Sequence, residues 1–434
     1  MKKLYLLLAV VAVAATSCQK DVVENIPCND PMTEEPCSPY AVSKEEALDK
    51  LYKGLAFLNG ETTTRANDRR VRKIEPVRYD KLAPATRSTV ADVEDLLYIV
   101  EFEDGKGSAI LGADKRVEGV FAVLDEGVIT SEDFNNAANG VATDELNTYL
   151  AGLIADEAIE QMSHDIIDPI LPPDPEELRV TYIVRDTIAD YYEYPRLRTH
   201  WSQKGIYNDK CLDDMGEECN AGPLTIAIAQ FLMSIYEPDA NYITIGGETF
   251  DRYKLITEDP NEVASYVYRV GITLGNDYLH EDYNESFESA IQLLTNYGFT
   301  SVDDDNIVTI GDIVEYVYNQ KRPVIMQGTN TYRNNDVHYW LIDGISHLSY
   351  RTYFYTYEGN KLVDVEYMGQ VSNSKVHANF GMGGKSNGFY SWSIFDVSQP
   401  LDDEDVITEI GDSPNAIGGN KNYSTDLCIL QYSI

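Results

Sequence analysis

The sequence has few basic residues for its length. Its 434 residues include 34 Lys and Arg against 72 Asp and Glu, which gives a formal net charge of −38. Such a charge repels phosphate backbones, so we expect no nucleic-acid partner. The acidity suits a soluble, secreted protein, and the length allows two domains that each bury a core.

Metal-binding and cofactor motifs are also missing. The sequence contains no CxxC pair, and its 6 histidines are scattered, which does not match the ligand spacing of a zinc site. The glycine-rich run at 381–386 lacks the spacing of a phosphate-binding loop. We therefore predict neither a metal nor a cofactor.

No apolar run at the N-terminus is long enough for a stable membrane anchor. Lys2 and Lys3 precede an apolar run at 4–15, which ends in small residues before Cys18. A bilayer span needs about 20 apolar residues, so this run is typical of a cleaved signal. It resembles a bacterial lipoprotein signal, which implies that a lipid on Cys18 tethers the chain in the cell envelope, at the outer membrane or cell surface. The alternative is an ordinary secretory signal with an incidental cysteine.

The other cysteines fit an oxidising compartment. If the first cysteine is lipidated, Cys28 and Cys37 are close enough in sequence to form one small loop. Cys211 and Cys219 are close enough to form another, which leaves Cys428 over. The sequence alone establishes neither pairing.

The first third of the chain predicts a tether followed by a small α+β unit. Residues 19–40 are rich in Pro, Asp, Glu and Asn, as expected of a tether. A capping box from Ser43 to Glu46 opens an amphipathic helix. Three strands are then predicted at 97–102, 108–111 and 119–124. A further helix is predicted at 143–162, and a proline-rich boundary follows at 165–177.

The rest of the chain mixes helices and strands. Helical periodicity predicts helices at 262–274, 286–297 and 312–320. Strands are predicted at 324–327, 339–343, 350–357, 361–367 and 375–380. Helices first and antiparallel strands later indicate an α+β fold.

One buried helix is predicted within residues 219–238. Gly222 ends a loop, Pro223 stands where a helix begins, and apolar residues recur at helical spacing before Pro238: Leu224, Ile228, Phe231 and Ile235. Such a helix start directs backbone N–H groups and the positive end of the helix dipole at one point. Proteins use this arrangement to activate a thiolate or to hold an oxyanion.

This stretch resembles the active-site helix of the streptopain family of papain-like cysteine peptidases. In that family a Gly-Cys pair opens a helix that is rich in Ala and ends in Ala-Gln. Ala227, Ala229 and Gln230 fit the pattern. Pro223 occupies the position of the family's cysteine.

Three further segments resemble the family in the expected order. The segment HWSQKGIYN places Gln203 at the glutamine that helps to form the oxyanion hole. The segment DVHYWLIDG places His338 at the catalytic histidine, and HANFGMGGKSNGFYSW places Asn379 at the residue that orients it. Phe380 and Met382 replace the family's two tryptophans.

The resemblance also extends to the N-terminal region. The run LLYIVEFEDGKGSAILGADKRVEGVFAVLDEG resembles the propeptide, or propeptide-like inhibitor domain, of streptopain relatives. The implied fold is α+β and papain-like, a helical part plus an antiparallel sheet part, preceded by a small α+β propeptide-like domain. We divide the chain into five parts. They are a signal (1–18), a tether (19–40), a propeptide-like domain (41–135), a connecting helix with a proline-rich linker (136–178) and a papain-like domain (179–434).

Pro223 decides between the functional hypotheses. A cysteine peptidase needs a thiolate beside an imidazole and an N–H donor at the developing oxyanion, and proline supplies neither sulfur nor N–H. Our leading hypothesis is an inactive pseudopeptidase with a peptide-binding or regulatory role, and hence a peptide or protein ligand. One alternative is an active cysteine endopeptidase that uses Cys219 with His338. The other is a peptidase inhibitor that acts through the N-terminal domain.

Overall fold

The computed structural model describes residues 40–58, 69–78, 82, 95–139, 141, 146–164, 179–235, 241–280, 283, 285–305, 309–330, 336–358, 361–395 and 428–433. The predicted lipidation site Cys18, nearly all of the tether, Cys28, Cys37 and the proline-rich linker lie outside these ranges. Within them, no helix is both long enough and apolar enough to cross a membrane.

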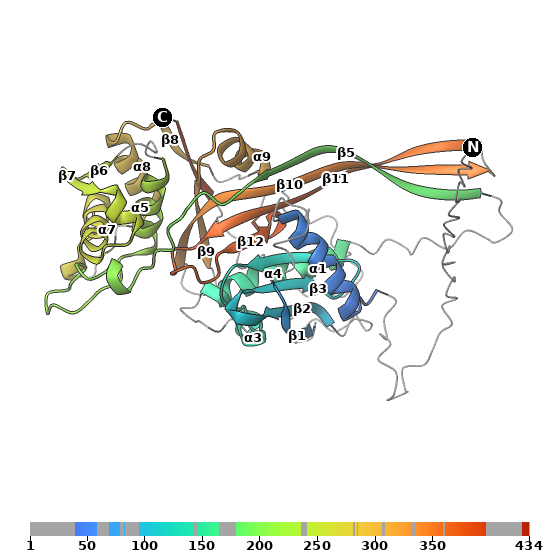
Figure 1. Cartoon of the computed structure of the whole chain (residues 1–434), viewed down its shortest axis with the longest axis horizontal. Helices are drawn as coiled ribbons and strands as arrows, with labels where there is room; N and C mark the ends of the chain where they lie inside the picture. Colours follow the sequence, from blue (N-terminus) through green and yellow to red (C-terminus); the bar gives the residue numbers. More distant parts are fainter. Residues whose placement is uncertain are drawn as a thin grey trace, which may run out of the picture.

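One large antiparallel sheet runs through the molecule (Figure 1). Its strands lie in the order β1, β2, β3, β4, β12, β11, β10, β9, β13 and β8, and β5 pairs with β10 off this path. The N-terminal strands join the C-terminal ones where β4 pairs with β12. The bounds are β1 (Val71–Arg78), β2 (Asp95–Phe102), β3 (Ser108–Gly112), β4 (Val120–Leu124), β5 (Arg179–Glu193), β8 (Thr300–Asp305), β9 (Val324–Asn330), β10 (Asp336–Glu358), β11 (Lys361–Asn379), β12 (Gly388–Ser391) and β13 (Cys428–Ser433).

Helix α1 (Lys44–Leu58) covers one face of the N-terminal strands. As the capping box predicts, Glu46 N donates a hydrogen bond to Ser43 Oγ at 3.2 Å. Leu51 and Leu55 are buried in a small core with residues of β2, β3 and β4. The predicted start of this helix is therefore confirmed.

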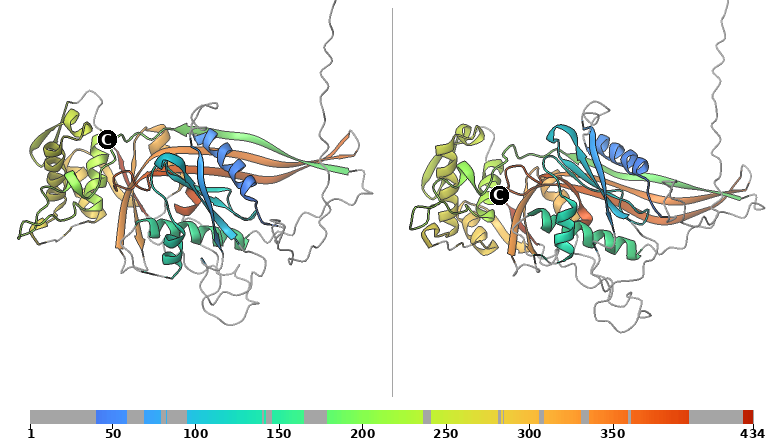
Figure 2. Two further views of the ribbon diagram at one scale, coloured as in Figure 1. Left: turned by 60° about the horizontal axis from the view of Figure 1, so that its bottom comes forward. Right: turned by 90° about the horizontal axis from the view of Figure 1, so that it is seen from below.

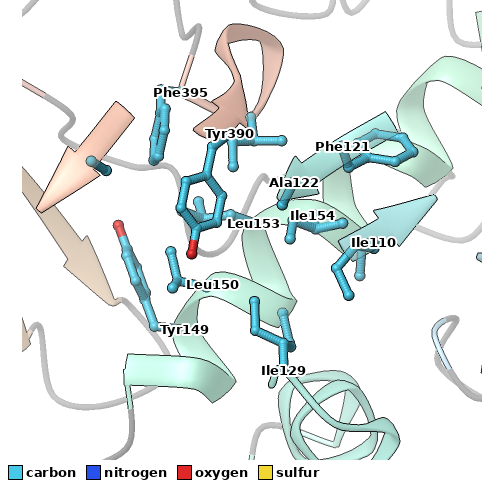
Figure 3. Packing of buried hydrophobic residues seen from close by; sticks show 14 of the residues in the cluster. Ile110, Phe121, Ala122, Ile129, Tyr149, Leu150, Leu153, Ile154, Tyr390 and Phe395 are labelled. Atoms are coloured by element: carbon cyan, nitrogen blue, oxygen red, sulfur yellow. The ribbon is translucent and has the colours of Figure 1, made fainter. Parts of the chain in front are cut away.

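Helices α3 (Ser131–Ala138) and α4 (Leu146–His164) belong to a second, larger core (Figure 3). This core contains Ile110 of β3, Ile154 of α4 and Tyr390 of β12. The N-terminal unit and the C-terminal strands therefore share one apolar core. Packing against each other removes the apolar surfaces of both parts from water.

Two buried charged side chains of β11 cross the same junction. Lys375 Nζ donates to Glu118 Oε1 at 2.7 Å. The ring of His377 lies between two carboxylates, with Nδ1 at 2.6 Å from Asp343 Oδ1 and Nε2 at 3.1 Å from Asp125 Oδ2. The contacts with Glu118 and Asp125 join the C-terminal strands to the N-terminal unit. The contact with Asp343 fixes the orientation of the His377 ring.

A helical unit lies at one end of the molecule (Figure 1). It contains α5 (Pro223–Ile235), α6 (Arg252–Ile256), α7 (Pro260–Leu274), α8 (Phe287–Asn296) and a hairpin of β6 (Tyr242–Ile245) and β7 (Glu248–Asp251). The helices predicted at 262–274 and 286–297 are confirmed, with small changes at their ends. The one predicted at 312–320 is a short α-helix, α9 (Ile310–Ile313), which continues as a π-helix over Val314–Asn319.

Strands β5, β10 and β11 extend away from the helical unit as a long twisted arm (Figures 1 and 2). The sequence predicts separate strands at 339–343 and 350–357, but this prediction is wrong, because β10 runs unbroken over 23 residues. Bulges in its pairing with β11 absorb the irregular positions, for example between Ile342 and Gly344. On the arm, the Tyr353 ring lies 5.4 Å from the Tyr367 ring, a cross-strand pair that stabilises it.

The predicted fold class is confirmed. The chain is α+β, with a helical part and a large antiparallel sheet that follow a small N-terminal α+β unit. Helix α5 packs against both β10 and α7, so within the helical unit the predicted active-site helix contacts the sheet.

Candidate functional site

The predicted helix start is present at α5. Gly222 adopts a φ of 98°, a left-handed conformation that favours glycine, and the helix begins at Pro223. Proline is well suited to the first helical position, because its missing N–H has no intrahelical partner there. Leu224 to Met233 are all buried, so the helix is held from every side.

A carboxylate of the same chain occupies this helix start. Glu285 accepts hydrogen bonds from Leu224 N at 3.1 Å and from Thr225 N at 3.5 Å. It also fills the space beside Gly222, where a Cβ would lie 1.8 Å from Glu285 Oε1. Burial raises the pKa of Glu285 to about 7, although the hydrogen bonds from Leu224 and Thr225 oppose this increase.

Neighbouring side chains fix this arrangement. Tyr339 of β10 donates to the backbone oxygen of Glu285 at 2.8 Å. Asn276 Nδ2 donates to Thr225 Oγ1 at 3.0 Å, and Tyr278 donates to the carbonyl oxygen of Ala221 at 2.9 Å. The first turn of α5 is therefore held by a polar network that includes the Glu285 carboxyl group.

Gln203 lies beside the start of α5. Its backbone oxygen accepts a hydrogen bond from Ala221 N at 3.0 Å. Its side-chain Nε2 lies 3.4 Å from Met382 Sδ. The predicted oxyanion-hole residue thus contacts the residue that replaces one of the family's tryptophans.

Asn379 also packs against α5. Its Nδ2 donates to the carbonyl oxygen of Thr199 at 3.0 Å, and its Oδ1 accepts from Gln230 Nε2 at 3.4 Å and Gly381 N at 3.1 Å. A Cβ on Gly381 would lie 2.8 Å from the Ile226 side chain, so glycine is needed for this close approach.

His338 lies at the start of β10, as predicted, but on a different face from α5. Its ring stacks on Tyr149 of α4, with ring centroids 4.9 Å apart. Its neighbour Tyr339 points to Glu285 and α5, and successive side chains of a strand point to opposite faces. The structure thus brings Gln203 and Asn379 to α5, whereas His338 packs against the N-terminal unit.

Cys219, the possible substitute nucleophile, is 7% exposed. Its Sγ lies 3.6 Å from the carbonyl oxygen of Tyr278 and 4.0 Å from that of Glu217. Neither Cys219 nor Cys211 forms a disulfide in the structure. These contacts of Cys219 are with Tyr278 and Glu217, and the ring stack of His338 is with α4.

Comparison with known families agrees with the order of these segments. Residues 201–390 match the model of the Peptidase C10 family. Residues 201–390, which make up less than half of the chain, are thus similar to the Peptidase C10 family. The match spans Gln203, Pro223, His338 and Asn379, which confirms the resemblance to the streptopain family that these segments predict.

Among solved structures, the chain is similar to a prointerpain A fragment from Prevotella intermedia, with 17% identity, a TM-score of 0.45, and coverage of 77% of this chain and 94% of the other. It is also similar to active wild-type interpain A cysteine protease from the same organism, with 16% identity, a TM-score of 0.34, and coverage of 60% and 98%. No curated protein matches the chain.

A pocket of about 450 Å³ adjoins the start of α5. It lies between the segment that follows Gln203 and the loop that leads into α5. Its lining residues are Lys204, Asn208, Glu218, Cys219, Asn220 and Tyr283. Tyr283 donates to the carbonyl oxygen of Asn220 at 2.9 Å and so fixes one wall.

Two residues of this site were not predicted from the sequence. Glu285 precedes an expected helix by one position, and nothing in its local pattern connects it with the distant α5. Tyr149 lies in a predicted helix, but its contact with His338 depends on how two separate units pack. Among the residues that the structure describes, no cluster of His, Cys, Asp or Glu is arranged to hold a metal ion.

Proposed function

We propose that this chain is an exported, lipid-tethered Peptidase C10 relative without peptidase activity, which binds a peptide segment beside α5. One observation supports the proposal most strongly: the Glu285 carboxylate accepts hydrogen bonds from the two amides that follow Pro223, the residue that the family resemblance assigns to the nucleophile position.

The chemistry of peptide hydrolysis explains why this observation matters. Attack on a peptide carbonyl needs a nucleophile and N–H donors aimed at the negative oxygen that develops. Pro223 offers no sulfur and no N–H. The amides of Leu224 and Thr225 already serve a carboxylate, and a second anion beside Glu285 would be repelled.

Cys219 is a poor substitute nucleophile. Its sulfur contacts carbonyl oxygens of Tyr278 and Glu217, neither of which lies on the strand that carries His338. His338, the base that it would need, is stacked on Tyr149. These contacts favour an inactive protein over an endopeptidase that uses Cys219 and His338.

The pocket beside α5 supports a ligand of peptide type. Lys204 and Glu218 place opposite charges on its rim, and the side chain of Tyr283 supplies an aromatic surface. Pockets of about 300–1,000 Å³ are typical of small-ligand sites, so this volume suits one or two side chains of a peptide.

Hydrolysis is tested with the chain that lacks residues 1–18, under reducing conditions and with fluorogenic casein and a mixed peptide library as substrates. We expect no turnover above buffer, with wild type and Cys219→Ala indistinguishable. Turnover by the wild type that disappears in Cys219→Ala would overturn the proposal in favour of an active peptidase.

Ligand binding is tested separately by fluorescence polarisation with the same library carrying a fluorophore. Charge reversal in Lys204→Glu is expected to weaken binding by about tenfold or more, because it makes the rim of the pocket uniformly acidic. Lys361→Glu, at the start of β11 on the arm, is the matched control and leaves binding unchanged. Equal loss in both variants, or no binding by wild type, contradicts a pocket for peptides.

Lipid tethering is tested at Cys18. We expect the full-length protein, expressed in a bacterium that processes lipoproteins, to partition into a detergent phase, and Cys18→Ser to remain in the aqueous phase. A wild type that stays in the aqueous phase indicates the ordinary secretory signal instead.

A further inference from the structure

Cys211 and Cys219 face each other across a hairpin in the loop before α5. Leu212 and Glu218 form an antiparallel bridge. Hydrogen bonds flank it on both sides, from Cys219 N to Cys211 O at 2.8 Å and from Asp213 N to Glu217 O at 2.9 Å. This pattern places the two cysteines directly opposite, with their side chains on the same face of the hairpin.

Directly opposite residues suit a disulfide. Cys211 and Cys219 form a hydrogen-bonded pair, whose Cα atoms lie about 5.5 Å apart, and disulfides join Cα atoms about 4.4 to 6.8 Å apart. The bond between Cys219 N and Cys211 O fixes the register. Little backbone movement is therefore needed to bring the two sulfurs together.

The two thiols differ in their access to solvent. Cys219 lines the pocket beside α5, whereas Cys211 is fully buried and is not part of the pocket wall. Burial raises the pKa of the Cys211 thiol to about 12; a hydrogen bond with Tyr278 opposes the increase, and the nearby Cys219 adds to it. A soluble oxidant thus reaches Cys219 first.

We propose that Cys211 and Cys219 form a redox-convertible pair, in which a small disulfide such as oxidised glutathione enters the pocket and is reduced. The Cys219 thiolate attacks the small disulfide, releases one thiolate and forms a mixed disulfide. Cys211 gives up its proton, attacks the Cys219 sulfur and releases the second thiol. The protein thereby loses two electrons and two protons, and one small disulfide becomes two thiols.

The disulfide fixes the pocket wall. The hairpin is followed directly by Asn220, Ala221 and Gly222. Ala221 N donates a hydrogen bond to the backbone oxygen of Gln203. A cross-link at the base of the hairpin restricts the segment that separates Gln203 from α5. Oxidation also removes the free thiol of Cys219 and with it the alternative of a Cys219-dependent peptidase.

Peptide mapping of the whole chain tests the pair. The protein lacking residues 1–18 is purified with a reductant, exchanged into oxidised glutathione at mildly alkaline pH and digested with trypsin without reduction. Lys210 and Arg252 bound one tryptic peptide that contains both cysteines. We expect this peptide to lose the mass of two hydrogens, and its two halves to stay joined after cleavage at Glu217 or Glu218 until a reductant is added.

Single variants are the controls. In Cys211→Ser, Cys219 is expected to retain one glutathione, because no second thiol resolves the mixed disulfide. In Cys219→Ser, Cys211 is expected to stay unmodified in the folded protein. A wild type that accumulates glutathione on Cys219, keeps both thiols, or pairs either cysteine with another partner overturns the proposal. None of these results bears on the proposed absence of peptidase activity, which has its own assay.

Discussion

At the scale of single residues, Glu285 places a carboxyl group at the start of helix α5. Helix N-termini stabilise negative charge, and here that charge is a carboxylate with hydrogen bonds from Leu224 N and Thr225 N. Because the carboxylate is also enclosed by protein, its pKa rises to about 7. Ionisation of the buried Glu285 carboxyl therefore destabilises the folded protein, and this effect depends on pH.

This cost predicts the effect of Glu285→Gln on stability. A carboxyl whose pKa is higher in the folded than in the unfolded state binds more protons when folded, so its contribution to stability falls as pH rises. The window runs from the usual value of 4.5 to about 7. As pH rises through this range, the free energy of unfolding of the wild type should fall by up to about 3 kcal/mol relative to that of Glu285→Gln.

Urea unfolding at a series of pH values between about 5 and 8 measures this difference. Glu288→Gln, an exposed position on α8, is the control and should follow the wild-type curve. If Glu285→Gln and wild type show the same pH dependence, Glu285 is ionised throughout the range, and the account of its pKa is wrong.

At the scale of elements, the structure predicts that restoring the cysteine alone does not restore a peptidase. Pro223→Cys returns a sulfur and an N–H to the start of α5. The Glu285 carboxylate remains beside it, and a like charge raises the pKa of a thiol. His338 remains on the face of β10 that packs against α4.

We therefore expect Pro223→Cys to hydrolyse no casein, and its thiol to react slowly with iodoacetamide near pH 8, where the Glu285 carboxyl is ionised. The double variant Pro223→Cys with Glu285→Gln should react about tenfold or more faster, since removing the neighbouring charge lowers the pKa of the thiol by at least about one unit. Pro223→Ala provides the background labelling of the native cysteines. Hydrolysis by Pro223→Cys alone would show that neither Glu285 nor the stacking of His338 prevents catalysis.

The elements also show what the sequence can predict. Helix α5 follows from Gly222, Pro223 and a continuous apolar pattern, which are local signals, and its predicted start at Pro223 is confirmed. The strand that carries His338 is likewise marked by its apolar run. The face to which His338 points is set by the pleat of β10 and by the packing of α4, neither of which is local. For the same reason Glu285 has no signature in the sequence, although it completes the site.

At the scale of the whole molecule, the N-terminal unit is built into the fold. Strand β4 pairs with β12, and α4 shares its core with the C-terminal strands. The two charged contacts at Lys375 and His377 add to this junction. To inhibit another peptidase, the N-terminal unit would have to separate from the C-terminal strands of its own chain. This separation would expose the shared core to water.

The electrostatic part of the junction has a definite pH window. Although burial alone lowers the pKa of His377, the carboxylates of Asp343 and Asp125 raise it to about 10. A histidine whose pKa rises on folding contributes stability that is complete below its usual value of 6.5 and is lost as pH increases through about 10. The junction should thus be strongest in neutral and acidic solution.

A split chain tests this view of the molecule. A protease recognition sequence inserted at 165–178, between α4 and β5, allows the purified protein to be cut into two fragments. We expect the fragments to elute together in gel filtration at neutral pH, because the shared core and the paired strands β4 and β12 still hold them. Raising the pH towards about 10 should lower the urea concentration at which they separate. Asp125→Asn, which removes one carboxylate partner of His377, should weaken this dependence. A folded C-terminal fragment that elutes alone at neutral pH would instead mark the N-terminal unit as releasable, and the inhibitor hypothesis would then replace the one proposed.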